Sequence, residues 1–529
     1  MRSPTAGPGW RLNGRVPLPS PQVPDLRPDP PIARALADDL RAAGFTASAL
    51  RGSWGANADD AIARGLRHPA LRALAGRDDA LAVLGRLLVL GTPQAVGAVD
   101  AALPRVRAEG LVALGLAARD EDAVAPMALI RPQSFADERG VGEWWIASDL
   151  DEAALGGPLP EGHVLGVGGA SLTLAALQLP TAARRVLDVG TGCGIQALRA
   201  RRDAEEVVGT DVSHRGLRFT ELNALLNDLD GISTRHGSLF APVEGERFDR
   251  VVSNPPFVIT PRIDGVPTYE YRDGGMAGDD LVAAFVSGVG GVLEPGGVAQ
   301  LLGNWETRGA QAGLDRVRDW VARSDVPLDA WIVERELLDP ISYAELWIRD
   351  GGTAPGSPGY AALIDAWLED FARRDVTAIG FGYLLLRRPL AGPPTLARYE
   401  RIAQHVEQAG LGAHVASALA AHDTLELLDD EGLAASVLVV APDVTEARHH
   451  MPGAEDPTVI ELRQSSGFGR ALSVDPALAA LVGACDGDLA VGPLIAAIAQ
   501  LLGADAEALR ADLLPRVRDL VFTGFLRFA

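Results

Sequence analysis

The chain has 529 residues, of which 48 are Lys or Arg and 70 are Asp or Glu, so its formal net charge is −22 at pH 7. This length exceeds one compact core and predicts roughly two to four domains, while two cysteines exclude a disulfide framework and a zinc cluster. A hydrophobic content of 47% excludes a disordered chain, and the acidic balance disfavours non-specific binding to nucleic-acid phosphates, although one basic cleft is compatible with it.

Residues 1–30 are rich in proline and lack an apolar core, so we expect a flexible tail and no signal peptide. The longest uncharged apolar run, residues 489–504, is shorter than the about 20 residues that a membrane span needs. Pro493 and Gln500 also interrupt it. The expected protein is therefore cytoplasmic, with no membrane partner.

Residues 31–155 predict a small, mainly helical N-terminal accessory domain. Helical periodicity begins at Ile32, with Leu36 and Leu40 on one face and Gly44 in position to end the helix. A second apolar helix is expected over residues 81–90, and more helix with a short hairpin follows. This domain is either an independent binding module or a lid on the next domain.

From about residue 156 to residue 390, short apolar strands alternate with helices, which predicts an α/β domain with a doubly wound, mainly parallel sheet. The expected strands are 186–189, 206–210, 248–252, 298–302, 330–334 and 379–386, and the expected helices include 195–202, 215–227 and 279–292.

Residues 391–529 form a C-terminal accessory domain without a nucleotide motif. Two helices at 494–502 and 506–522 and a short strand at 524–528 resemble a winged-helix unit. Because the chain is acidic, we favour protein docking over DNA binding for this unit.

The first expected strand runs into a glycine-rich turn, Asp188-Val189-Gly190-Thr191-Gly192-Cys193-Gly194. Glycines let the backbone turn tightly and approach a ligand where a Cβ would clash. Asp211 ends the next strand, 23 positions after Asp188, where a carboxylate can accept both hydroxyls of a ribose. Asp188 itself is placed to meet a cationic ammonium, and the turn predicts a nucleoside cofactor.

The fourth strand of the sheet ends in Asn254-Pro255-Pro256-Phe257, on the same edge as the glycine turn. The Asn254 side-chain oxygen and the Pro255 carbonyl can accept both N–H groups of a planar nitrogen, on which charge develops as it attacks. Two prolines stiffen the loop, and Phe257 is placed to stack on the planar group. This pattern indicates an acceptor site for an amide or amino nitrogen.

The glycine turn with Asp211 resembles motif I and its acidic successor in class I S-adenosylmethionine-dependent methyltransferases. The Asn-Pro-Pro-Phe segment resembles the [N/D]PP[Y/F/W] signature of their amino-methyltransferase branch, which includes glutamine methyltransferases of release factors and ribosomal proteins and N-methyltransferases of rRNA and DNA bases. The resemblance covers about residues 160–300 well and extends weakly to 390. Ser238 stands where the family often has an acidic residue. Segment 163–171, expected to cover the site, lacks the proline-arginine sequence of the release-factor enzymes.

The resemblance implies a Rossmann-like domain that binds S-adenosyl-L-methionine. The cofactor contacts that it implies are Asp188, Gly190, Thr191, Gly192, Gly194, Asp211, Val212, Ser238, Leu239 and Asn254. The catalytic segment that it implies is Asn254, Pro255, Pro256 and Phe257. Phe257 is also expected to contact substrate, as is Arg272 in the glycine-rich segment 271–280.

The function expected from these features is N-methylation of a planar amide or amino nitrogen of a macromolecule, with protein glutamine preferred over nucleic acid. One alternative is an rRNA, tRNA or DNA base N-methyltransferase. Another is a non-catalytic, cofactor-sensing regulator that binds DNA through the winged-helix-like unit. No metal is expected, because His449-His450 has no neighbouring ligands in the sequence.

Overall fold

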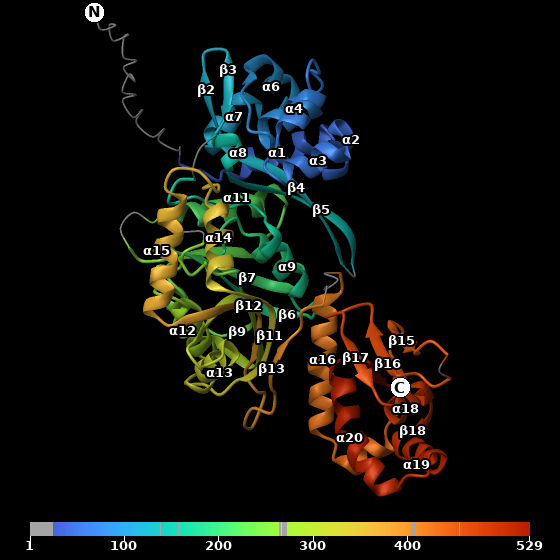
Figure 1. Ribbon diagram of the computed structural model, residues 1–529. Helices are drawn as coiled ribbons and strands as arrows, with labels where there is room; N and C mark the ends of the chain where they lie inside the picture. Colours follow the sequence, from blue (N-terminus) through green and yellow to red (C-terminus); the bar gives the residue numbers. More distant parts are fainter. Residues whose placement is uncertain are drawn as a thin grey trace, which may run out of the picture.

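A computed structural model of the protein describes residues 25–137, 139–156, 159–263, 266, 272–404, 409–453 and 455–529 (Figure 1). Most of the expected tail, residues 1–24, lies outside the described residues, as does Tyr271 at the start of the glycine-rich segment. No helix in the described ranges is long and apolar enough to cross a bilayer.

The N-terminal lobe contains more β-structure than the sequence pattern indicated. Its helices are α1 (Pro30–Ala42), α2 (Ala47–Trp54), α3 (Ala56–Ile62), α4 (His68–Ala73), α5 (Ala80–Leu84), which continues as a π-turn η1 (Gly85–Val89), α6 (Val96–Ala102), α7 (Arg107–Leu114) and α8 (Glu152–Leu155). Strands β1 (Gln94–Ala95), β2 (Ala117–Asp120) and β3 (Ala123–Pro126) form a small antiparallel sheet. Strands β4 (Ala128–Asp137) and β5 (Gly140–Asp149) form a hairpin that is longer than the one expected.

The first helix begins two residues before the expected start, because Asp29 caps it. The Asp29 side chain accepts a hydrogen bond from the Ile32 N–H, and Pro30 occupies the first helical turn. Leu36 and Leu40 are buried, as the periodicity predicts.

An eight-stranded sheet occupies the centre of the molecule, in the order β13-β11-β12-β10-β9-β6-β7-β8. Its strands are β6 (Ala183–Val189), β7 (Ala204–Asp211), β8 (Ile232–His236), β9 (Phe248–Ser253), β10 (Leu293–Arg308), β11 (Asp329–Leu338), β12 (Val376–Arg387) and β13 (Ala397–Arg401). Strands β10, β9, β6, β7 and β8 are parallel, and β12 runs antiparallel between β10 and β11. The sheet includes β13, which follows the domain boundary expected at residue 390.

Helices flank this sheet, and an inserted pair stands beside it (Figure 1). They are α9 (Gly169–Leu177), α10 (Ile195–Arg201), α11 (His214–Leu226), α12 (Asp280–Gly288), α13 (Gly313–Ala322), and the inserted helices α14 (Pro340–Asp350) and α15 (Tyr360–Arg373). Two short 3₁₀ turns, η2 (Ala241–Val243) and η3 (Val289–Val292), complete the connections. The doubly wound α/β domain predicted from the sequence is confirmed.

The C-terminal lobe has the expected helix, helix and strand at its end. Its helices are α16 (Leu411–Glu426), α17 (Asp430–Ala435), α18 (Pro476–Ala484), α19 (Val491–Leu502) and α20 (Ala506–Phe522). Strands β18 (Asp486–Ala490), β14 (Val437–Val440) and β19 (Leu526–Phe528) form one sheet, and β15 (Val444–His449), β16 (Val459–Gln464) and β17 (Ala471–Val474) form another. The central strand β14 comes from upstream of the winged-helix-like unit, which the terminal pattern did not indicate.

Both outer lobes share hydrophobic cores with the central domain. One core joins Leu36 and Leu40 of the N-terminal lobe to Phe219 and Leu222 of α11. A second core joins central-sheet residues such as Trp331 to Val415, Leu481 and Phe522 of the C-terminal lobe. The N-terminal lobe therefore packs against the central domain through a shared core.

Two asparagines, Asn223 in α11 and Asn227 at its C-terminal cap, attach the β4–β5 hairpin to the central domain. Asn223 Oδ1 accepts a hydrogen bond from the Ala147 N–H at 2.7 Å, and its Nδ2 donates to the Ala147 carbonyl at 2.9 Å. Asn227 makes the same pair of bonds with the Trp145 backbone, at 2.9 Å each. Asn223 Nδ2 also donates to the Cys193 carbonyl, within the glycine turn, at 2.7 Å. These amides pair with the edge of β5 as a neighbouring strand would.

Candidate cofactor and acceptor site

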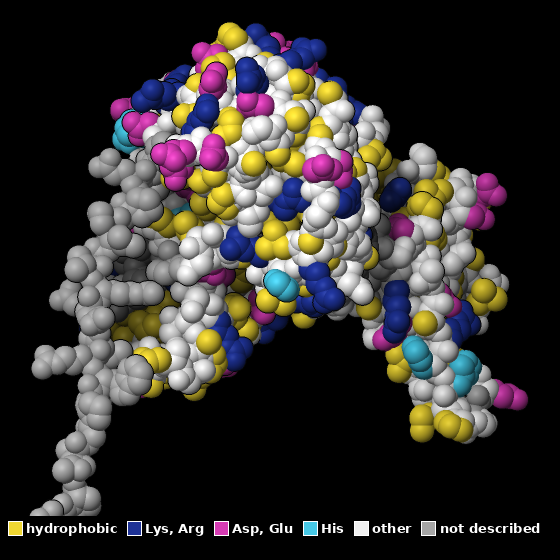
Figure 2. All heavy atoms as spheres, turned by 90° about the horizontal axis from the view of Figure 1, so that it is seen from above, with side chains coloured by type: hydrophobic (Ala, Val, Ile, Leu, Met, Phe, Trp, Pro, Cys, Tyr) yellow, Lys and Arg dark blue, Asp and Glu magenta, His cyan; other side chains and the backbone are white. Residues whose placement is uncertain are grey.

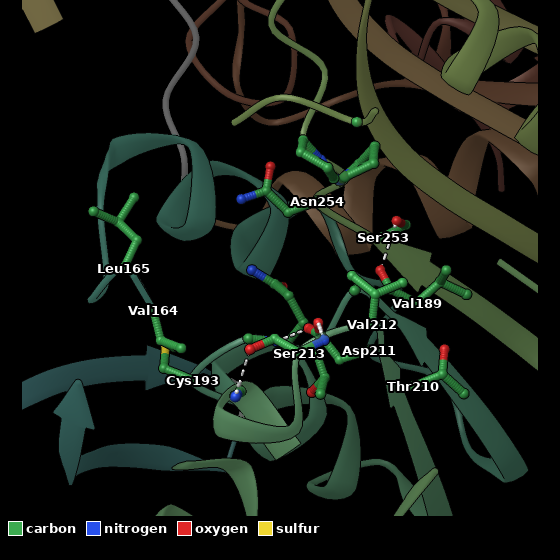
Figure 3. A pocket seen from close by; sticks show the side chains of 18 of the residues that line it. Val164, Leu165, Val189, Cys193, Thr210, Asp211, Val212, Ser213, Ser253 and Asn254 are labelled. Carbon is green, nitrogen blue, oxygen red and sulfur yellow. Dashed lines mark hydrogen bonds between the residues drawn. The ribbon is translucent and has the colours of Figure 1, made fainter. Parts of the chain in front are cut away.

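A cavity of about 430 Å³ lies where the strands β6, β7 and β9 end, which is a size typical of ligand sites (Figure 3). The glycine turn and Asn254 follow neighbouring strands, since Val189 of β6 pairs with Ser253 of β9. Of the expected site residues, those that line the cavity are Gly190, Thr191, Gly192, Asp211, Val212, Ser238, Leu239, Asn254, Pro255 and Pro256. In Figure 3, Asn254 lies above Asp211 in the view.

The first two glycines of the turn leave room for a ligand. Gly190 has φ +73° and Gly192 has φ +53°, in the left-handed region that favours glycine. A Cβ built on either glycine would meet no heavy atom within 4 Å, although both residues line the cavity. A side chain here would therefore enter the ligand space, so the cavity fits a cofactor that approaches the backbone closely.

Gly194 has a different role from the one expected. Its φ is +84°, but a Cβ would lie 3.0 Å from Thr220 of α11. The residue does not line the cavity. Gly194 permits close packing of the turn against α11 and makes no cavity surface.

Asp211 connects the end of β7 to the glycine turn. Its Oδ2 accepts a hydrogen bond from the Gly192 N–H and its Oδ1 accepts one from the Ser213 N–H, both at 2.8 Å. Burial raises the pKa of this carboxyl despite these donors. The backbone thus fixes the carboxylate at the cavity wall, where its remaining lone pairs can accept ribose hydroxyls.

Asp188 lies behind the turn and does not line the cavity, in contrast to its expected contact with an ammonium. Its Oδ2 accepts a hydrogen bond from Thr191 Oγ1 at 2.8 Å, and its Oδ1 is buried without a partner in the described part of the chain. Burial raises the pKa of Asp188 to about 7, and the neighbouring Asp211 adds to the shift. The carboxyl therefore supports the turn from beneath and changes its charge near neutral pH.

Two histidines stabilise the cavity wall that contains Val212 and Leu239, and the sequence did not reveal them. His236 Nε2 lies 2.9 Å from the carbonyl oxygen of Val212, and the His236 ring stacks on His214 with centroids 3.9 Å apart. Leu239, at the same wall, has φ +47°. The two histidines are far apart in the sequence, so no local pattern indicates their contact.

The segment 163–171 covers part of the cavity, as expected, through His163, Val164, Leu165, Gly166 and Ser171.

The residue that fixes this covering segment is Asp149, at the end of β5. Asp149 Oδ2 accepts a hydrogen bond from the Val164 N–H at 2.9 Å, while Arg215 of α11 donates to Asp149 Oδ1 through Nε at 2.8 Å. An N-terminal-lobe residue therefore sets the position of the covering segment.

At the acceptor end, Asn254 presents the oxygen that its sequence motif predicts. Its Nδ2 is 3.4 Å from Ser171 Oγ, which orients the amide. Its Oδ1 is buried and has no hydrogen-bond partner among the residues described here. Because an unpaired buried oxygen costs about 1–3 kcal/mol, this atom has free capacity for an N–H donor from outside the described residues.

Phe257 and Arg272, both expected to contact the substrate, do not line this cavity. Phe257 is partly buried and packs against Phe381, with ring centroids 5.5 Å apart. Arg272 is 6% exposed, and its Nη1 donates to the Trp347 carbonyl and to Asp350 Oδ2, both at 3.0 Å. Arg272 therefore anchors the end of α14.

The inserted helices α14 and α15 support the acceptor loop, a role that sequence reasoning missed. Tyr343 Oη of α14 accepts hydrogen bonds from the Ile259 N–H at 3.0 Å and from Asn304 Nδ2 at 2.5 Å. Burial raises the pKa of Tyr343, so the phenol stays neutral. Val258 and Ile259 share a hydrophobic core with Tyr343 and other residues of α14 and α15. This core holds the chain directly after Phe257 in place.

A family model described as "methyltransferase small domain" matches residues 168–266, and two domains of unknown function match residues 42–127 and 419–528. The release factor glutamine methyltransferase of Xylella fastidiosa (strain 9a5c) is 32% identical over 151 residues, which are 27% of this chain and 55% of that protein. The same enzyme of Geobacter sulfurreducens is 35% identical over 131 residues, 23% of this chain and 46% of that protein. The chain thus spans about half the length of the curated relatives that it matches.

Among solved structures, the ribosomal protein L11 methylase of Lactobacillus delbrueckii subsp. bulgaricus aligns with 41% of this chain and 77% of its own, at 18% identity and a TM-score of 0.24. The sheet order, the glycine turn, the cavity and the matched family model agree with one another. Residues 168–266 therefore lie in a class I S-adenosylmethionine-dependent methyltransferase domain that is similar to glutamine methyltransferases.

Proposed function

We propose that the protein transfers a methyl group from S-adenosylmethionine to a planar nitrogen of a macromolecule, preferably the side-chain amide of a protein glutamine. The observation that carries this proposal is Asn254 Oδ1, a buried oxygen directly after β9 that has no donor among the described residues. Asn254 lines the same cavity as Gly190 and Gly192, so donor and acceptor sites adjoin.

In this proposal, some residues bind the cofactor and others stabilise the charge that develops on the acceptor nitrogen. Bound S-adenosylmethionine supplies an electrophilic methyl group. The glycine turn and Asp211 hold the nucleoside, and Asn254 Oδ1 with the Pro255 carbonyl accepts the two N–H groups of the attacking nitrogen. Because these acceptors are fixed beforehand by two prolines, they stabilise positive charge as it develops without reorganising.

Charge and similarity favour a protein acceptor over a nucleic acid. The net charge of −22 opposes binding of a polyanion. On the face seen in Figure 2, arginine and acidic side chains are interspersed, with no continuous basic surface. The relatives reported above are named for glutamine in release factors, which agrees with an amide acceptor.

The test is incubation of the protein with S-[methyl-³H]adenosylmethionine and a bacterial lysate, followed by separation of protein from RNA and DNA. We expect label in protein, recovered as N5-methylglutamine after enzymatic digestion, and a strongly reduced rate of labelling with Asn254→Ala. Label confined to nucleic acid would support a base methyltransferase. Cofactor binding by calorimetry without any transfer would support a non-catalytic regulator.

A further inference from the structure

We propose that Asp273 is a catalytic residue whose Oδ2 accepts the proton that the acceptor nitrogen loses on methylation. This inference rests on the proposed function, and it assigns a role to a residue outside the motifs of the sequence. Asp273 lines the same cavity as Asn254 and Pro255.

One oxygen of Asp273 is held by the protein and the other is not. Oδ1 accepts a hydrogen bond from the Gly275 N–H at 3.1 Å and pairs with Arg262 Nη2. Oδ2 is buried and has no partner within the described ranges, and the residue is only 9% exposed. Since a buried unpaired carboxylate oxygen is costly, its persistence at a cavity wall indicates a ligand that supplies a proton donor.

The backbone places Asp273 directly beside the acceptor loop. Asp273 and Phe257 form an antiparallel bridge, and the Val258 N–H donates to the Arg272 carbonyl at 2.9 Å. Arg272 is fixed in turn by the end of α14. Asp273 is therefore attached to the loop that carries Asn254, and its position does not depend on bound substrate.

The other acid–base groups that line the cavity are less suited to this step. Both oxygens of Asp211 accept backbone N–H groups at the cofactor end. Burial raises the pKa of the Cys193 thiol to about 11, which keeps this thiol protonated near neutral pH. Burial lowers the pKa of His163, which makes its imidazole a weaker base than an ordinary histidine. Burial also raises the pKa of Asp273, which brings the carboxyl closer to the range in which a general base is effective near neutral pH.

The step balances in atoms and charge. The nitrogen lone pair forms the N–CH3 bond as the S–CH3 bond breaks, and the sulfur keeps that electron pair and becomes a neutral thioether. Once the nitrogen is methylated, one of its two N–H groups turns from the Asn254–Pro255 acceptors to Asp273. An Oδ2 lone pair of Asp273 forms an O–H bond with that proton, while the nitrogen keeps the electrons of its former N–H bond. One positive and one negative charge disappear together, and the carboxylic acid later returns its proton to solvent.

Asp273→Asn tests the proposal, because asparagine keeps an oxygen for the Gly275 N–H but cannot take a proton. In the ³H-methyl assay, with the lysate protein that the wild type labels, we expect a roughly 10²-fold lower kcat. Cofactor affinity by calorimetry should stay within about twofold of wild type. The wild-type rate should rise with pH as the carboxyl ionises, and this dependence should vanish in the variant.

Arg262→Gln separates proton transfer from a structural ion pair. Loss of the cation raises the pKa of Asp273, so the rise in rate should move to higher pH while activity at alkaline pH is retained. If both variants instead lose activity equally with unchanged pH profiles, Asp273 is structural and the proposal is overturned.

A second readout does not require turnover. Infrared difference spectra between acid and alkaline pH should contain a buried protonated-carboxyl band that Asp273→Asn lacks, and absence of this band from the wild type would overturn the proposal. Failure of the proposed function is a distinct result, namely cofactor binding by the wild type without labelling of any macromolecule.

Discussion

The two carboxylates that line the cavity, Asp211 and Asp273, are held in different ways. Asp211 has both oxygens bonded to backbone N–H groups from the glycine turn and from the start of α11. Asp273 has one oxygen bonded and one buried without a partner in the described structure. The carboxylate at the expected cofactor end is thus held by local backbone geometry, whereas the expected acceptor end retains hydrogen-bond capacity that no described residue meets.

The largest expected effect tests the acceptor end. Asn254→Ala removes the unpaired Oδ1 and should lower kcat by about 10²- to 10³-fold, with cofactor affinity unchanged. Asn254→Asp keeps an oxygen acceptor and should retain part of the turnover. An equal loss of cofactor binding in Asn254→Ala, measured by calorimetry, would contradict the assignment of Asn254 to the acceptor end.

The second effect tests the cofactor end. Asp211→Ala removes the carboxylate and should raise the Kd for S-adenosylmethionine roughly 10- to 100-fold, the equivalent of one or two charged hydrogen bonds. Glu205→Ala, an exposed position on the same strand, is the matched control. Unchanged calorimetric affinity in Asp211→Ala would contradict the assignment of this end.

The third effect concerns Asp188, which lies behind the glycine turn. Its carboxyl has a pKa of about 7 in the protein without ligand. A cationic ligand favours the ionised carboxylate, so binding should release a proton below that pKa. Affinity should therefore rise with pH by up to about tenfold per unit through this range and level off above it. Asp188→Asn should abolish the pH dependence, which calorimetry in buffers of different ionisation enthalpy would detect.

The linkage of Asp188 to stability has the opposite sign. Because its folded pKa is raised above the unfolded value, the unfolded state binds fewer protons between pH of about 4 and 7. The stability that Asp188 contributes without ligand should be fully present below this window and be lost as pH rises through it. The difference in thermal midpoint between the wild type and Asp188→Asn isolates this contribution, and a difference that grows in favour of the wild type as pH rises over the window would contradict the burial of a protonated carboxyl.

The smallest effect distinguishes two glycines of the same turn. Gly194→Ala forces a Cβ against Thr220 at a positive φ and should cost about 1 kcal/mol or more in stability, with little direct effect on the cavity. Gly190→Ala carries a similar backbone strain, but its Cβ enters the ligand space, so cofactor affinity should fall severalfold as well. Thermal denaturation and calorimetry on both variants measure the difference.

Local sequence signals predicted the elements that carry the cofactor end. Strands 186–189 and 206–210 are apolar runs, and the glycine turn between them follows from residues that are close in the chain. The acceptor segment was likewise evident from four consecutive residues. Each of these signals lies within a few residues, so periodicity and turn chemistry are sufficient to find it.

Contacts between distant segments could not be predicted in the same way. Asp149 meets Arg215 across 66 positions and Ile259 meets Tyr343 across 84, and no local pattern records either pairing. An apolar run does not reveal strand direction, so the antiparallel β12 was not distinguished from its neighbours. An aromatic residue such as Phe257 can serve as an exposed plate or as packing, and the sequence alone did not reveal its contact with Phe381.

The hydrogen bonds of the Asn223 and Asn227 amides with β5 have a practical consequence for the design of shorter forms of this protein. A fragment that began at the first strand of the central sheet would lack the backbone groups of residues 145 and 147 that satisfy both amides. The same cut would expose the apolar face of α11 to water. The smallest portion that preserves a working cofactor loop therefore includes the N-terminal lobe, and deletion of that lobe should yield an insoluble product instead of an unregulated enzyme.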